Sequence, residues 1–521
     1  MDLTNKERNL LFWASFLSLA AAGFGFVFRV MMPNIWADEF NITGAEVGHL
    51  AGAALWPIAI TMILFSFLVD KIGYKSSMMI AFGLQTLSVI LTFVAKDTRI
   101  LWYACFAAGL GHGVVEACIN PLCAAIYREE KSKWLNILHA AWPAGIAAGG
   151  TIYLLTRDSL HWNTVFLFML LPVIAYAVMF LLCHRYPADE RVEANVSTRD
   201  MLKEFGGLGA FIAITFLFYE IAKQAGGHFD PDGSSFVMQN HLSVSLAIGA
   251  LGGLIFGFVV KSMGQILFFI LCLIMIPLAT AELATDGWIQ SLMQPVLAEE
   301  YDMHSGWAIV ASACIMMTLR FFAGVPLKFM SPPALLLFSS IFSIIGLYLL
   351  SGATGIMIFV AFAFYAVGQT FYWPTVLGFV AERFPKGGAV TLNTVSAIGL
   401  LTVGIFGFPF LGAVKDSFDA KAVKATEPAI YAEAQAAGIA ENKKLFGVPY
   451  QSINTEKLMD EVEIDAHNKT VLEDEIDKSA RKTIKVAAVL PLTMAIAFLF
   501  IIIWFRMNGG YKAIHLTQPE A

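Results

Sequence analysis

The feature that most constrains the fold of this chain is a series of apolar runs, each about as long as a bilayer is thick. A helix of about 20 apolar residues spans the hydrocarbon core of a membrane. Only 14% of the residues are charged, whereas soluble domains have about 25%. We therefore predict an all-α integral membrane protein with about 14 transmembrane helices. The runs lie near residues 9–35, 46–69, 77–95, 100–127, 135–156, 162–184, 206–225, 239–262, 264–295, 304–325, 331–351, 354–382, 388–413 and 484–506.

The basic residues between these runs predict the orientation of the helices. With the N-terminus in the cytoplasm, most Lys and Arg residues near the first six helices fall on the cytoplasmic side. The outer loops there contain only Lys96, Arg99 and Arg157. This asymmetry follows the positive-inside rule. We expect a multi-pass protein of the cell (inner) membrane with both termini in the cytoplasm.

The runs are grouped as six, two and six, which predicts two six-helix bundles with an inserted central pair. The polar segment before the last run is rich in Glu, Asp, Lys and Ala. It can lie outside the cytoplasm, either as a small helical cap or as a partly disordered insertion. The expected parts are the N-terminal bundle (1–185), the cytoplasmic linker with the inserted pair (186–263), five helices of the second bundle (264–413), the polar insertion (414–483), and the last helix with its cytoplasmic tail (484–521).

Three short segments of the first half have weak counterparts in the second half, in the same order. Arg29–Pro33 matches Gln290–Pro295, Gly111–Pro121 matches Gly368–Pro374, and Leu135-Asn136 matches Leu392-Asn393. Such a repeat predicts two six-helix halves in parallel, with a substrate bound between them near the middle of the membrane.

A charged motif, Asp70-Lys71-Ile72-Gly73-Tyr74-Lys75, separates the second and third helices. It resembles the cytoplasmic loop of major facilitator superfamily transporters, although Ser66 replaces the first glycine of the family motif and Tyr74 replaces a basic residue. The resemblance implies a conformational gate, in which ion pairs form in one state and break in the other. The expected gate residues are Asp70, Lys71, Gly73 and Lys75.

Within that superfamily, the fourth and fifth helices resemble the fucose:proton symporter family. The matching residues are Gly109, Gly111, Glu116, Ala117, Asn120, Pro121, Leu135, Asn136 and Ala140. The resemblance implies that Glu116 contributes to sugar binding and proton coupling, and that Asn120 belongs to the sugar site. A carboxylate inside a membrane helix costs about 2.5–3.5 kcal/mol on insertion scales, so a partner or a function is expected for it.

Arg29 departs from this family, which has a carboxylate at the matching position before Pro33. Guanidinium does not deprotonate in proteins, so Arg29 cannot carry a proton. Two interpretations remain. Arg29 can pair with Glu116 and organise the cavity, or it can bind the carboxylate or phosphate of an anionic substrate.

Histidines near Glu116 are candidates for a proton relay. His112 lies four residues before Glu116 and so shares its helix face. His139, on the fifth helix, is expected to hydrogen-bond a neighbour rather than to carry protons.

The second half has its own intramembrane acids, which are functional candidates by default. Glu282 and Asp286 are four residues apart and can take over the coupling role that Arg29 cannot perform. Arg320 is the expected cationic partner, unless it extends to the membrane surface instead.

Aromatic and amide side chains complete the expected substrate site. Sugars stack their C–H faces on aromatic rings and bind amides through their hydroxyl groups, so this combination favours a carbohydrate. The candidates are Trp56, Trp142, Trp288, Tyr372 and Trp373, with the amides Asn120, Asn136, Gln290, Gln369 and Asn393.

We therefore predict a secondary-active transporter that moves a small polar solute by alternating access with proton coupling, and the residues favour a sugar as this solute. The alternatives are an organic-anion transporter anchored by Arg29, and a non-transporting membrane sensor. No enzymatic activity, cofactor, metal or nucleic-acid partner is expected. The expected partners are the solute, the proton and the lipid bilayer, and the protein is expected to be a monomer.

Overall fold

The computed structural model describes residues 3–42, 44–230, 233–285, 304, 306–355, 357–462 and 464–516. Within these residues, twelve helices are long and apolar enough to cross a membrane. One of them, Glu46–Val94, contains two of the predicted runs. A third predicted run, 135–156, forms a shorter broken helix. The prediction of an all-α membrane protein with about 14 helices is confirmed.

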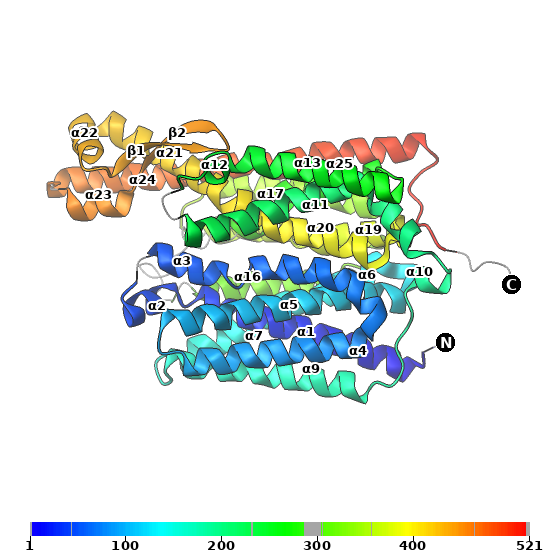
Figure 1. Cartoon of the computed structure of the whole chain (residues 1–521). Helices are drawn as coiled ribbons and strands as arrows, with labels where there is room; N and C mark the ends of the chain where they lie inside the picture. The colour runs from blue at the N-terminus through cyan, green and yellow to red at the C-terminus, as the bar shows by residue number, and fades with distance from the viewer. Residues whose placement is uncertain are drawn as a thin grey trace.

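The first half of the chain forms one bundle, at the bottom of Figure 1. Pro33 and Pro57 lie in the first two positions of their helices, and Thr4 caps the first helix through a capping box with Glu7. The elements are α1 (Asn5–Val30), α2 (Pro33–Phe40), α3 (Gly44–Gly52), α4 (Trp56–Val94), α5 (Thr98–Ile126), a 3₁₀ turn (Arg128–Glu130), α6 (Lys131–His139), α7 (Ala141–Thr156), α8 (Trp162–Val165), a 3₁₀ turn (Phe166–Met169) and α9 (Leu170–Leu182).

Glycines let the helices of this bundle approach closely. Gly73, with φ of 80°, turns the chain between the two membrane-crossing parts of α4, a conformation that favours glycine. At Gly145 of α7, a Cβ atom would lie only 2.0 Å from the backbone oxygen of Ala20 in α1. The contact between α1 and α7 therefore depends on a glycine, as is common where membrane helices pack.

The inserted pair follows a short linker and packs beside the second bundle (Figure 1). Gly206, with φ of 59°, separates an initial surface segment of the first inserted helix from its membrane part. The elements are α10 (Glu190–Glu193), α11 (Thr198–Phe229), α12 (Phe236–Gln239) and α13 (His241–Val260).

The second bundle contains two π-helical segments, which often mark functional sites. One of them includes Glu282. The elements are α14 (Ile266–Ala279), a π segment (Thr280–Ala284), α16 (Gly306–Phe321), a 3₁₀ turn (Pro326–Lys328), α17 (Pro332–Leu350), α18 (Met357–Gln369), α19 (Tyr372–Arg383), a 3₁₀ turn (Pro385–Gly387), α20 (Gly388–Thr402), a π segment (Val403–Gly407), α21 (Phe408–Thr426) and α25 (Val489–Met507).

The polar insertion is folded and lies at the end of the bundle opposite both chain termini (Figure 1). It contains the end of α21, α22 (Pro428–Ala436), a hairpin of β1 (Ala440–Leu445) and β2 (Val448–Ile453), α23 (Thr455–Glu461) and the first part of α24 (Ala466–Ala487). The strands pair antiparallel, with Ala440 opposite Ile453. Residues such as Val423, Tyr431 and Leu472 form a separate small core. The insertion is thus a compact cap, and its hairpin was not expected from the sequence.

Candidate functional site

A buried polar cluster surrounds Glu116 in the middle of α5. Asn120, one turn further along, donates its amide N–H to Glu116 Oε2 at 2.7 Å. His112, one turn earlier, places Nε2 3.7 Å from Glu116 Oε1. The i, i+4 spacing thus brings the three side chains together, as predicted for His112 and Glu116. Among the described residues, no Lys or Arg lies within ion-pair distance of Glu116.

His139 of α6 joins this cluster through Asn120. Its Nε2 lies 2.9 Å from Asn120 Oδ1, so the asparagine side chain bridges Glu116 and His139. This contact agrees with the expectation that His139 hydrogen-bonds a neighbour. It also fixes the helices α5 and α6 relative to each other.

The cluster continues into the second half through Arg320. Nη1 of Arg320 donates to the backbone oxygen of His139 at 3.0 Å, and Nη2 donates to Glu282 Oε1 at 2.8 Å. Glu282 Oε2 accepts from the backbone N–H of Trp373 at 3.2 Å. The predicted partnership of Glu282 and Arg320 is therefore confirmed.

These contacts form one chain of buried polar groups that crosses between the halves, which we name the polar network. Its members are His112, Glu116, Asn120, His139, Arg320 and Glu282. The two carboxylates differ in their surroundings. Glu282 is held by a guanidinium, whereas the described contacts of the Glu116 side chain are an amide and an imidazole.

Arg29 lies elsewhere, inside the first bundle. Its guanidinium donates to the backbone oxygen of Gly25 at 2.8 Å and to Ser88 Oγ at 2.8 Å, and lies 5.5 Å from the ring centre of Phe166. The ion pair with Glu116 that one interpretation required is absent from the described contacts. That pairing prediction is wrong for this structure, because Nη1 and Nη2 of the guanidinium donate to neighbours in its own bundle, while Nε is buried without a hydrogen-bond partner among the described residues.

Two amides that are predicted to bind a sugar connect the halves in this structure. Asn136 in α6 donates to Thr375 Oγ1 in α19 at 3.1 Å. Its repeat counterpart, Asn393 in α20, donates to the backbone oxygen of Ala117 at 3.1 Å and to Ser66 Oγ at 3.0 Å. The repeat seen in the sequence thus corresponds to a pair of reciprocal contacts between halves.

The predicted aromatic residues are divided between different places. Trp142 stacks on His112, with ring centres 5.0 Å apart and an interplanar angle of 19°, so it borders the polar network. Trp373 is buried next to Glu282, and Tyr372 and Gln369 are buried nearby in the sequence. Trp56 packs on Phe106, 5.4 Å between ring centres.

Three further candidates cannot be placed. Asp286, Trp288 and Gln290 lie outside the described residues.

The end of the bundle that bears both termini is held by charged contacts that the sequence only partly predicts. Asp70 pairs with Arg191 of the linker, not with a cation of its own motif, and Lys75 donates to the backbone oxygen of Leu181 at 2.9 Å. Lys71 is exposed, and Gly73 supplies the turn. The sequence did not predict Arg191 as the partner of Asp70, because the linker after the sixth helix carries no recognised motif.

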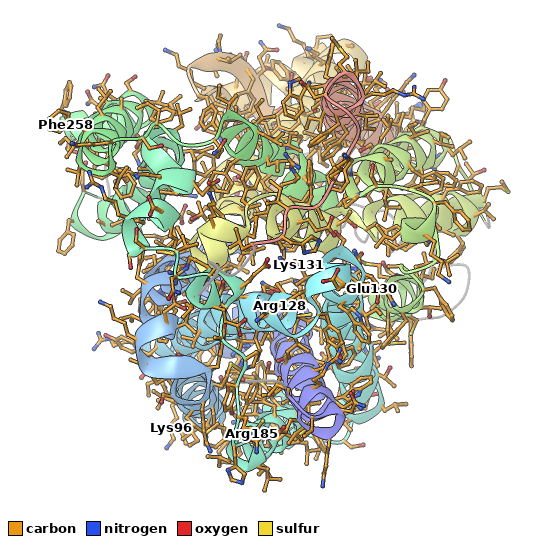
Figure 2. The ribbon with its side chains drawn as sticks, turned by 90° about the vertical axis from the view of Figure 1, so that its right-hand side faces the viewer. Lys96, Arg128, Glu130, Lys131, Arg185 and Phe258 are labelled. Carbon is orange, nitrogen blue, oxygen red and sulfur yellow. The ribbon has the colours of Figure 1, made fainter. Side chains whose placement is uncertain are left out.

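Other contacts at this end connect the two halves directly. Lys131 pairs with Glu190 of the linker at 2.6 Å and also donates to the backbone oxygen of Ala381 in the second half at 3.3 Å. The backbone N–H of Ser132 donates to Glu382 at 3.1 Å. Figure 2 looks onto this end and shows Lys131 where the cyan helices of the first half meet the yellow helices of the second. The halves are therefore closed against each other here.

The linker is also fixed to the first bundle. Arg128 Nη1 donates to Glu193 Oε2 at 2.7 Å. This hydrogen bond holds the pKa of Glu193 below its ordinary value.

Comparison with known proteins identifies the kind of scaffold that carries this site. A family model described as "Major Facilitator Superfamily" matches residues 12–286, more than half of the chain. The "Gentisate transporter" of Corynebacterium glutamicum is 21% identical over 182 residues, which cover 34% of this chain and 40% of that protein. "Protein TsgA" of Salmonella paratyphi B is 26% identical over 220 residues, 42% of this chain and 56% of that protein. The matches thus span about half the length of these relatives.

Solved structures show the same fold over nearly the whole chain. The proton:xylose symporter XylE has a TM-score of 0.59 at 11% identity and covers 96% of this chain and 97% of its own. The human organic anion transporter MFSD10 has a TM-score of 0.55 at 11% identity, and the match covers 94% of this chain and 99% of that chain. The transporter FucP in its outward conformation has a TM-score of 0.51 at 13% identity, and the match covers 93% of this chain and 98% of that chain. At these identities the likeness concerns the fold alone.

Proposed function

The chain belongs to the major facilitator superfamily, and on this premise we propose that it carries a small polar solute across the membrane by alternating access, driven by protons. We further propose a neutral, sugar-like solute, and Glu116 as the group that takes up and releases the proton. It is then an active transporter rather than a membrane sensor on the same fold. The proposed orientation has both termini in the cytoplasm of the inner membrane.

The observation that carries the proposal is the difference between the two buried carboxylates. Protonating Glu282 would leave the guanidinium of Arg320 buried without its paired charge, and such a loss typically costs about 3–5 kcal/mol. The described side-chain contacts of Glu116 are the amide of Asn120 and the imidazole of His112, and no Lys or Arg is among them. It can therefore change its charge without stranding a buried cation.

The position of Arg29 supports the same assignment. A guanidinium paired with Glu116 would have favoured the charged carboxylate and opposed proton uptake. Arg29 instead contacts Gly25, Ser88 and Phe166, all in the first bundle. The replacement of a family carboxylate by Arg29 therefore does not argue against proton coupling through Glu116.

The surroundings of the polar network support a carbohydrate-like solute. Trp142 lies beside His112 of the first half, and Trp373 lies beside Glu282 of the second half. An aromatic face suits the apolar C–H face of a sugar, while amide and imidazole groups suit its hydroxyls. XylE is described as a proton:xylose symporter and FucP as a fucose:proton symporter, and both share the fold.

An organic anion is the second candidate, and the relatives favour it. One curated relative is named a gentisate transporter, and one structural neighbour is an organic anion transporter. The geometry gives this candidate less support, because Arg320 is already paired with Glu282 and both Nη atoms of Arg29 donate to groups of its own bundle.

Uptake into proteoliposomes tests the proposal. The purified chain is given a panel of labelled neutral monosaccharides, sugar acids and gentisate, with and without an inward proton gradient. The proposal expects a neutral sugar to accumulate only with the gradient. Accumulation of an acid alone would replace the sugar by the organic-anion alternative, and binding of a solute without any flux would favour a sensor.

A further inference from the structure

The segment after the last helix returns to the end of the bundle that bears both termini. α25 ends at Met507, and Gly509 and Gly510 follow with φ of 87° and 88°, a backbone conformation that favours glycine. The N–H of Gly510 donates to the backbone oxygen of Phe505 at 2.7 Å, so the turn packs onto the end of the helix. The chain then runs along the end of the bundle toward α10 (Figure 1). We name residues 509–516 the C-terminal strap.

The first part of the strap is anchored on the second half. The ring of Tyr511 packs on Phe379 and on Phe505, with ring centres 5.6 Å and 5.2 Å apart. Arg383 Nη1 donates to the backbone oxygen of Lys512 at 2.6 Å. All these contacts lie within the second bundle, so they can persist when the two halves move relative to each other.

Glu382, in the last turn of α19, is shared between the strap and the first half. Its Oε2 accepts from the hydroxyl of Tyr511 at 2.6 Å, and its backbone oxygen accepts from the N–H of Ile514 at 2.8 Å. Its Oε1 accepts from the backbone N–H of Ser132 in the first half at 3.1 Å. One oxygen of this carboxylate therefore binds the strap, while the other binds the first half.

The last part of the strap reaches the linker, which is fixed to the first bundle. The N–H of Leu516 donates to Glu190 Oε1 at 2.7 Å. Glu190 Oε2 pairs with Lys131 of the first half at 2.6 Å, and Glu193, one turn further along the linker, accepts from Arg128 of the first half. The strap is thus bound to the second half at its beginning and, through Glu190, to the first half at its end.

We propose that the C-terminal strap acts as a latch, which stabilises the state in which the two halves are closed at this end. Opening this end moves Leu516 away from Lys131, so one of the two bonds of Glu190 must break. The contact between Glu382 and Ser132 must break as well. The strap supplies the donor to Glu190 and holds the Glu382 carboxylate in place, and a group that is already held in its bound orientation forms a contact at a lower entropic cost.

A role for the strap in one of two states rests on the proposed function, transport by alternating access. The movement of the halves can be measured without any solute. A strap that does not affect this movement is therefore distinguishable from a chain that does not transport, because uptake and the distance between the halves are separate readouts.

The distance between the two halves in the purified full-length chain tests the proposal. One spin label is attached at Ser76, after the turn at Gly73 in the first half, and one at Lys328, in the turn after α16 of the second half. Both side chains are exposed. Cys314, the exposed native cysteine, is replaced by serine in every chain compared. Pulsed electron paramagnetic resonance then gives the ratio of open to closed molecules at this end.

Two shortened chains separate the strap from the residues that follow it. A chain that ends after Gly510 lacks the donors to Glu382 and Glu190, whereas a chain that ends after Leu516 retains them and is the matched control. We expect the ratio of open to closed molecules to be at least about tenfold higher in the first chain, because hydrogen bonds to charged groups are lost. An equal ratio in the two shortened chains would overturn the proposal.

A single substitution tests the contact with Glu382 in the complete chain. Tyr511→Phe keeps the ring but removes the hydroxyl that donates to Glu382, so the ratio of open to closed molecules should rise about threefold. Lys512→Ala is the control, because Arg383 binds its backbone oxygen and its side chain is exposed. If the chain that ends after Gly510 does not fold, as judged by gel filtration, Tyr511→Phe decides. A ratio in Tyr511→Phe equal to that in Lys512→Ala would overturn the proposal.

Discussion

Removing one member of the Arg320–Glu282 pair should destabilise the protein far more than removing the charge of Glu116, a carboxylate of the same network that has no Lys or Arg partner among the described residues. Arg320 donates to Glu282 at 2.8 Å, to the backbone oxygen of Thr370 at 2.7 Å and to that of His139 at 3.0 Å. In Glu282→Gln the two carbonyl contacts can persist, but the paired negative charge is gone. An uncompensated buried charge costs about 3–5 kcal/mol.

The matched variant is Glu116→Gln, in which no buried cation loses its partner. Glutamine can still accept from Asn120 through its amide oxygen, so we expect a change of about 1 kcal/mol or less, the net value of one hydrogen bond. The double variant Glu282→Gln with Arg320→Met removes both charges of the pair. It should recover about 2 kcal/mol or more relative to the sum of the two single effects.

The assay is reversible unfolding in mixed micelles of mild detergent and dodecyl sulfate, followed by circular dichroism. It gives the free energy of unfolding of each variant relative to the unchanged chain. The reasoning is refuted if Glu282→Gln costs no more than Glu116→Gln. It is also refuted if the effects of Glu282→Gln and Arg320→Met simply add.

Three further predictions concern helix contacts and the closed end. Gly145→Val should greatly reduce the yield of folded protein in gel filtration, because its Cβ would lie 2.0 Å from a backbone oxygen of α1; Gly412→Ala, with open space around it, should fold normally. Asn136→Ala removes the 3.1 Å contact to Thr375 and should increase the labelling rate of a cysteine placed at the end that bears both termini. An equal labelling rate in the chain that retains Asn136 would contradict this prediction. The hydrogen bond from Arg128 lowers the pKa of Glu193 from 4.5, so it stabilises the folded state above that pH, and this stabilisation is lost as the pH falls through the lowered pKa. The difference in Tm between Glu193→Gln and the unchanged chain should therefore shrink between about pH 6 and about pH 3. A difference in Tm that does not depend on pH would contradict the assignment.

The fold could be predicted because the bilayer restricts the possible structures so strongly. Backbone groups inside a membrane must be satisfied within the segment, so apolar runs of this length have to be helices. The short turn at Gly73 and the broken helix from α6 to α7 change how the spans are divided, not where they lie. The fold of the cap was harder to predict, because its β-hairpin packs against Val423 and Leu472, which are distant from it in the sequence.

Part of the candidate site could also be predicted. The cluster of His112, Glu116 and Asn120 follows from spacing on one helix, since residues four apart share a face. The pair of Glu282 and Arg320 could be expected because a charge inside a membrane needs a partner, and few are present. The spacing on one helix was sufficient to predict the first contact, and the small number of charged residues inside the membrane was sufficient to predict the second.

The role of Arg29 could not be predicted in the same way. The sequence shows a cation in the first helix but not which way its side chain points. Ser88 and Phe166, its partners, come from helices whose rotation about their own axes depends on packing. The same limit applies to Asn136 and Asn393, whose partners lie in the opposite half.

The position of the charged motif could be recognised from the sequence, but the partner of Asp70 could not. Asp70 and the turn at Gly73 could be recognised from their motif. Arg191, which pairs with Asp70, belongs to an irregular linker, and only the folded path of that linker brings it to the motif.

The most direct test of the central claim is to count the protons that enter with the solute. Purified protein in proteoliposomes is given the transported solute in weakly buffered solution, and the external pH is recorded for the unchanged chain and for Glu116→Gln. The account predicts that solute entry makes the external solution alkaline with the unchanged chain. Glu116→Gln should still exchange labelled for unlabelled solute but should give no pH change. A pH change of equal size in Glu116→Gln would contradict the assignment of the proton to Glu116.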